Sequence, residues 1–155
     1  MTALLTGERI DNWIGGQRVA PQNGQYMESE DPSIAKTWTL VPDGDATDVD
    51  AAVSAASEAF RGPWRSMPTL SRAELLRSVA NEIAKHKEEL ATIESRDNGK
   101  PIAESVAGDL PAVCEILKYW AGAADKLHGE TVEVSPTSFN FTVHEPIGVV
   151  GIIVP

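Results

Sequence analysis

The chain has 155 residues, of which 42% are hydrophobic and 23% are charged, a composition typical of a globular protein and not of a disordered segment. Its formal net charge of -10 argues against nucleic acid or an anionic membrane as a partner, because phosphate groups would repel it. The one cysteine excludes an intramolecular disulfide, and no apolar run approaches the roughly 20 residues of a membrane helix. Since the N-terminus also lacks a signal-peptide pattern, we expect a cytoplasmic protein.

Residues 10–41 predict small antiparallel strands. In "WIGGQRV", two glycines separate the short apolar segments around Ile14 and Val19. Adjacent glycines readily adopt the positive φ angles that a two-residue hairpin turn requires. We therefore expect a hairpin that turns at Gly15 and Gly16.

The first helix is predicted to begin at Thr47. This residue is a suitable N-cap, and Asp48 and Asp50 would place negative charge in the first turn. Apolar residues then recur at helical spacing up to Phe60. Gly62 and Pro63 are expected to end this helix.

The next helix has the strongest local signal. In "LSRAEL", Ser71 and Glu74 have the spacing of a capping box, so the helix is expected to begin at Ser71. One apolar stripe then runs from Leu75 to Ile93, with charged residues on the other side. "DNGKP" predicts the end of this helix near Asn98 and Gly99.

A third helix is predicted from a cap at Asp109, with Pro111 in its first turn, to Gly129. It contains the one cysteine, Cys114, at helical spacing between apolar neighbours. A nucleophilic thiolate needs an electropositive setting or an adjacent base, so Cys114 is interpreted as a buried structural residue. The histidines lack the spacing of a metal site.

The last two segments change to strand patterns. Phe139, Phe141 and Val143 alternate with polar residues, and "SPTS" predicts the turn of a hairpin. Residues 148–154 are β-branched and uncharged, which is typical of a strand buried on both faces of a parallel sheet. "GVVG" within this stretch is no dinucleotide-binding fingerprint, so its glycines are interpreted as packing residues.

These segments, in this order, resemble the N-terminal portion of an NAD(P)-dependent aldehyde dehydrogenase. The succession comprises "WIGGQRV", "DPSIAKTW", "DVDAAVSAASEAF", the helix from "SRAELL" to "DNGKP", "YWAGAADKLHG" and "EPIGVVGIIVP". The resemblance implies an α/β fold in which small antiparallel strands and helices (residues 1–129) precede an oligomerisation hairpin (residues 130–146). The first strand of a Rossmann-like cofactor domain follows (residues 147–155).

Site residues follow from the same resemblance. The end of the last strand, Ile153, Val154 and Pro155, would line the adenosine half of an NAD or NADP site. Some relatives bind a monovalent cation near motifs similar to "ESEDP" and "RDNGK", which would assign Ser29, Glu30 and Asp97, although Asp97 could equally cap the turn at Asn98. No catalytic residue transfers, because the family's catalytic cysteine, glutamate and oxyanion asparagine lie further along the chain.

Two functions remain open. The first is a fragment of an oxidoreductase that, when complete, oxidises an aldehyde to its acid and forms a homodimer or homotetramer. This chain would then be inactive by itself. The second is a catalytically inert interaction module or a pseudogene product, whose exposed hairpin and unpaired strand would bind partners.

Overall fold

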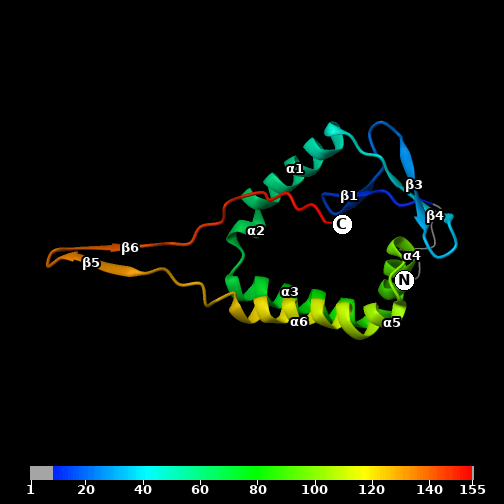
Figure 1. The fold of residues 1–155 in the computed structure, drawn as a ribbon. Helices are drawn as coiled ribbons and strands as arrows, with labels where there is room; N and C mark the ends of the chain where they lie inside the picture. The colour runs from blue at the N-terminus through cyan, green and yellow to red at the C-terminus, as the bar shows by residue number, and fades with distance from the viewer. Residues whose placement is uncertain (1–8, 155) are drawn as a thin grey trace.

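The computed structural model describes residues 9–154 (Figure 1). Its strands form three separate two-stranded antiparallel sheets: β1 (Asn12–Ile14) with β2 (Gln17–Val19), β3 (Tyr26–Asp31) with β4 (Lys36–Pro42), and β5 (Thr131–Ser135) with β6 (Ser138–Phe141). The helices are α1 (Ala46–Arg61), α2 (Pro63–Ser66), α3 (Thr69–Lys85), α4 (Lys87–Asn98), α5 (Ile102–Glu104), the π-helical turn η1 (Ser105–Asp109) and α6 (Leu110–Ala123). Within this part of the chain, no helix combines the length and hydrophobicity needed to cross a membrane.

The first hairpin is confirmed. Strands β1 and β2 pair Trp13 with Arg18 and Ile14 with Gln17, and the turn consists of Gly15 and Gly16. Their φ angles are 61° and 79°, in the left-handed region where a Cβ atom would be strained. The two glycines therefore supply the turn geometry that the sequence predicts.

Helix α1 is confirmed, but its cap lies two residues before Thr47. Asp45 is the N-cap, and its Oδ1 accepts a hydrogen bond from the Thr47 amide at 2.8 Å. Asp48 completes a capping box, because its Oδ2 accepts from the Asp45 amide at 3.1 Å. Asp45 and Asp48 therefore form the two reciprocal capping bonds that Ser and Glu form in the common capping box.

The capping box predicted at Ser71 is wrong. Helix α3 begins at Thr69, directly after Pro68, and Ser71 lies inside its first turn without a capping bond. Pro68 has φ -57° and ψ 145°, so the extended backbone that precedes the helix ends at the proline. Glu74 does not reach back to the Ser71 amide but accepts from Arg77 at 2.7 Å.

The predicted stripe from Leu75 to Ile93 is divided between two helices. At His86 the backbone leaves the helical region (φ -102°, ψ 18°), so α3 ends and α4 begins in a new direction. Leu90 and Ile93 thereby line a cavity with Leu110 and Val113 instead of continuing along α3. The end of α4 at Asn98 agrees with the prediction.

The third predicted helix is displaced at both ends. Asp109 is already helical and makes no capping bond, because it belongs to the π-helical turn and its carboxylate pairs with Lys100. The helix ends at Ala123, before the expected Gly129. Gly129 has another role, since a Cβ atom there would lie 1.8 Å from the carbonyl oxygen of Thr142 where the two ends of the β5–β6 hairpin meet.

Helices α3 and α6 form an antiparallel pair along one side of the molecule (Figure 1). Small residues line the contact between them, and the buried ones are Ala73, Ala80, Cys114 and Ala121. We call these four residues the α3–α6 seam. Ala91 of α4 is the other buried apolar residue in the described part of the chain, which buries no leucine, isoleucine or aromatic side chain there.

The strand predicted at residues 148–154 is not formed. This segment runs past α1 and α2 without regular structure, and Ile152, Ile153 and Val154 are exposed. A strand needs ladder hydrogen bonds, and none of the described strands pairs with residues 148–154. The strand in a Rossmann-like domain stays a prediction from the β-branched pattern.

Candidate functional site

The structure brings together two of the three predicted cation-site residues. The Ser29 hydroxyl on β3 donates to Oδ1 of Asp97 on α4 at 2.7 Å, although 68 positions separate them in the sequence. Glu30 lies beyond a bulge between Ser29 and Glu30 and is exposed. In residues 9–154, no group of three or more His, Cys, Asp or Glu side chains is arranged to hold a metal ion. The cation site stays a prediction.

Sequence reasoning missed two members of this cluster. Trp38 on β4 donates its indole N–H to Ser29 Oγ at 3.1 Å, and the Arg96 guanidinium lies 5.2 Å from the centre of the Trp38 ring. Knowledge of the β3–β4 register would have identified Trp38, because Ser29 pairs with Thr39, the residue next to Trp38. Nothing in the spacing of the sequence signals Arg96.

Arg96 of α4 also contacts the buried carboxylate of Asp31, the last residue of β3. Arg96 Nε lies 3.8 Å from Asp31 Oδ2, and the Ser33 hydroxyl donates to Asp31 Oδ1 at 2.5 Å. The bond from Ser33, helped by the nearby Arg96 charge, holds the pKa of Asp31 below its usual value. The cluster fastens the β3–β4 hairpin to α4.

The predicted cofactor residues lie apart from this cluster, in the segment after the β5–β6 hairpin. Ile153 and Val154 are exposed, while Pro155 lies outside the described residues. Further back, Gly148, Val149 and Val150 border a cavity of about 280 Å³ with Phe60 and Trp64 of the α1–α2 region. Residues 147–154 thus offer a ligand apolar contact surface but no charged side chain.

Cys114 lies in the α3–α6 seam with 7% of its surface exposed, and its thiol donates to the Ala80 carbonyl at 3.3 Å. Lys87, Glu115 and Lys118 border a cavity with Cys114, but in the described residues the thiol bonds only to the Ala80 carbonyl. The histidine rings contact other groups and do not cluster. His86 Nδ1 lies 3.2 Å from the Glu89 carboxylate, and His144 Nε2 lies 3.1 Å from the His128 carbonyl oxygen. The geometry of Cys114 is that of a packing residue.

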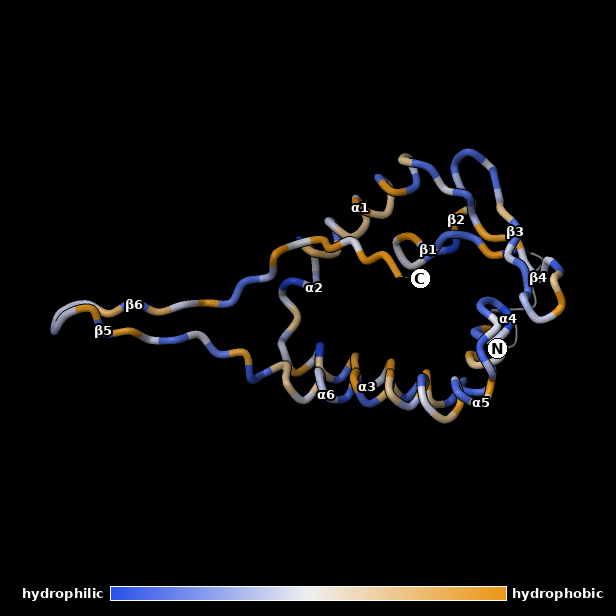
Figure 2. Tube along the Cα trace, viewed as in Figure 1, coloured by the Kyte–Doolittle hydropathy of each residue, from blue (hydrophilic) through white to orange (hydrophobic). Residues whose placement is uncertain are grey.

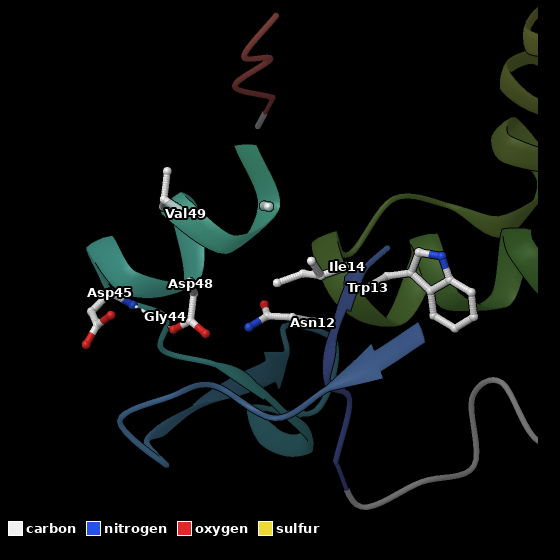
Figure 3. Close-up of a pocket in the computed structure, with 8 residues that line it drawn as sticks. Asn12, Trp13, Ile14, Gly44, Asp45, Asp48 and Val49 are labelled. Atoms are coloured by element: carbon white, nitrogen blue, oxygen red, sulfur yellow. Dashed lines mark hydrogen bonds between the residues drawn. The ribbon is translucent and has the colours of Figure 1, made fainter. Parts of the chain in front are cut away.

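A further cavity of about 240 Å³ lies where β1 meets the start of α1 (Figure 3). Asn12 points toward Asp48, and its buried side-chain nitrogen has no hydrogen-bond partner in the described structure. Asp48 accepts from the amides of Gln22 and Asp45 at 3.0 and 3.1 Å. Its carboxylate thus caps α1 and also holds the loop between β2 and β3.

Comparison with known proteins defines the family. Residues 19–155 match the aldehyde dehydrogenase family, and the chain belongs to it. It is 39% identical over 148 residues to acetaldehyde dehydrogenase 2 of Cupriavidus necator, covering 96% of this chain and 29% of that protein. It is 40% identical over 143 residues to the mitochondrial aldehyde dehydrogenase family 2 member B4 of Arabidopsis thaliana, covering 92% and 27%.

Solved structures agree. An NAD+ complex of an aldehyde dehydrogenase from Bacillus cereus superposes with a TM-score of 0.89 at 38% identity, over 94% of this chain and 30% of that chain. The α/β arrangement of small antiparallel strands and helices is therefore that of the N-terminal part of aldehyde dehydrogenases, as the sequence predicts. The chain spans about 30% of the length of the relatives it matches.

Proposed function

We propose that this chain supplies the N-terminal part of an enzyme that oxidises an aldehyde to a carboxylic acid with NAD or NADP. The observation that carries the proposal is the family match over residues 19–155, which includes every element from β3 to β6. Relatives with bound NAD+, including the Bacillus cereus enzyme, support the cofactor. Which aldehyde is oxidised depends on parts of the relatives that this chain does not cover.

The cofactor residues fit this proposal in their chemistry. Ile153 and Val154 offer exposed branched apolar side chains, which suit contact with an adenine ring. When bound, the cofactor supplies a hydride acceptor. Ile153, Val154 and Pro155 would line its adenosine half, and the groups that act on the aldehyde would come from outside residues 1–155.

The partner in assembly is proposed to be another copy of the complete protein. The β5–β6 hairpin projects away from the helices (Figure 1), and its Phe139 and Phe141 rings are about two-thirds exposed, with centroids 6.4 Å apart. A two-stranded ribbon with an exposed apolar face is marginal by itself in water. Packing of this ribbon between subunits would produce a homodimer or homotetramer.

The test is an assay of the complete gene product with short aldehydes, in which the formation of NADH or NADPH is followed by absorbance. We expect turnover with at least one cofactor and none from residues 1–155 by themselves. A complete protein that is folded by circular dichroism and binds neither cofactor nor aldehyde would contradict the proposal and favour the inert interaction module.

A further inference from the structure

The chain contains two Asn-Gly pairs, Asn23–Gly24 and Asn98–Gly99. In such a pair the backbone nitrogen of the glycine can attack the side-chain carbon Cγ of the asparagine, because the glycine has no side chain to obstruct the approach. The first pair lies in a turn between β2 and β3, and the second ends α4. The glycine φ angles are similar, 68° and 78°. Because the two pairs share their chemistry, a difference in reactivity has to come from their surroundings.

Each pair holds a hydrogen-bond donor at the oxygen that becomes charged when Cγ is attacked. The Gln25 amide donates to Asn23 Oδ1 at 2.8 Å, and the Lys100 amide donates to Asn98 Oδ1 at 2.8 Å. A donor already fixed at a developing oxyanion lowers the barrier to its formation. This feature favours the reaction at both asparagines and does not discriminate between them.

Asn98 is restrained by its helix. Its Nδ2 donates to the Glu94 carboxylate at 2.7 Å, which is a charge-assisted bond, and the Gly99 amide donates to the Ser95 carbonyl at 2.9 Å. Gly99 also packs against Pro32, since a Cβ atom on the glycine would lie 3.1 Å from the proline ring. The Gly99 nitrogen can therefore reach Cγ of Asn98 only when the last turn of α4 opens.

Asn23 is held by weaker contacts. The Gly24 amide donates to the Pro21 carbonyl at 2.9 Å, and Asn23 Nδ2 donates to the Asp43 carbonyl at 2.8 Å, so both bonds join neutral groups. In the described chain, a Cβ atom on Gly24 would meet no atom within 4 Å. Figure 2 shows a hydrophilic loop before β3, and Asn23 belongs to no helix or strand there. Rotation of this peptide thus breaks turn contacts and no regular element.

We propose that Asn23 is a site of spontaneous covalent modification and that α4 protects Asn98 from the same reaction. The Gly24 nitrogen bonds to Cγ of Asn23 and gives its proton to water, while the Cγ–Nδ2 bond breaks and ammonia leaves. Water then opens the resulting cyclic imide at either carbonyl, which produces aspartate or isoaspartate. Overall, water is consumed and ammonia is released, and no oxidant or cofactor takes part. The proposal is independent of the proposed function.

The modification changes how the turn is attached. The Nδ2 donor is replaced by an oxygen, which cannot donate to the Asp43 carbonyl and repels it. Asp43 lies two residues before Asp45, the N-cap of α1. Conversion of Asn23 therefore releases the turn before β3 from the loop that leads into α1.

The test is incubation of the complete protein at mildly alkaline pH, folded and in urea, until the unfolded sample is modified at both asparagines. Peptide mapping by mass spectrometry follows each asparagine separately. We expect similar rates in urea. In the folded protein, Asn23 should react about tenfold faster than Asn98 or more, because a hydrogen bond to a charged group lowers the population of the open state by about this factor.

Two variants serve as matched controls. Asn23→Gln has a longer side chain that would have to form a larger, less favourable ring, so the early mass change should be lost. Asn98→Gln should keep it. Circular dichroism verifies the fold of each protein, and the comparison of the two asparagines within the unmodified protein requires no variant.

Three outcomes overturn the proposal. The first is a rate at Asn98 that equals or exceeds the rate at Asn23 in the folded protein. The second is a folded protein in which Asn23 stays unmodified under conditions that modify it in urea. The third is an early mass change that persists in Asn23→Gln, which would place the reactive residue elsewhere.

Discussion

At the scale of single residues, Asp45 is the cap on which α1 depends. Its carboxylate accepts from the Thr47 amide, and replacement by alanine leaves that amide without its partner. We expect Asp45→Ala to lower the free energy of unfolding by about 1 kcal/mol, as is typical for the loss of an N-cap. Urea unfolding of the complete protein, followed by circular dichroism, measures this difference.

Ser71→Ala is the control for this prediction. Because Ser71 lies inside α3 and caps nothing, its replacement should change the free energy of unfolding by less than about 0.5 kcal/mol. A larger loss for Ser71→Ala than for Asp45→Ala would mean that the helix start in solution is the one that the sequence pattern predicts.

Cys114 provides a second prediction at this scale. In the complete protein, Cys114→Ser should leave kcat/KM within a small factor, because the thiol packs in the seam and donates to the Ala80 carbonyl, a bond that a hydroxyl can also make. Steady-state kinetics with the unmodified protein as reference provide the measurement. Abolished turnover in a protein that still folds would show that Cys114 takes part in the chemistry.

At the scale of elements, the β5–β6 hairpin carries the prediction on assembly. Phe139→Ser with Phe141→Ser removes two exposed aromatic rings and should shift the complete protein to a smaller oligomer. Asn140→Ser, on the other face of the same strand, is the control. Size-exclusion chromatography with light scattering gives the mass of each variant, and an unchanged mass for the double variant would place the subunit interface elsewhere.

The same scale shows what the sequence could and could not predict. The Gly15–Gly16 and Pro136–Thr137 turns are fixed by local backbone preferences, so both hairpins were predictable. The start of α3 was not, because Pro68 determines it more strongly than the capping pattern at Ser71. The family resemblance predicted that Ser29 and Asp97 lie close together. Arg96 could not be predicted, because it reaches this cluster only through the packing of α4 on the β3–β4 hairpin.

At the scale of the whole molecule, the uncovered apolar surface predicts poor solubility. Residues 1–155 expressed by themselves should form large assemblies, because residues 147–154 present an exposed, unpaired β-branched segment. Removal of residues 148–155 should increase the soluble fraction. Light scattering after size-exclusion chromatography compares the two chains, and a cooperatively folding monomer of the full 155-residue chain would contradict this prediction.

The α3–α6 seam has a consequence for experiments on dynamics. It leaves only 7% of Cys114, the one thiol of the chain, exposed, so a thiol reagent should react much faster when the two helices move apart. The rate of labelling under native conditions therefore reports the free energy of this local opening, and no other site in the sequence contributes to the signal. A bound partner that clamps the pair together would slow the labelling, which turns a buried packing residue into a built-in probe of helix separation.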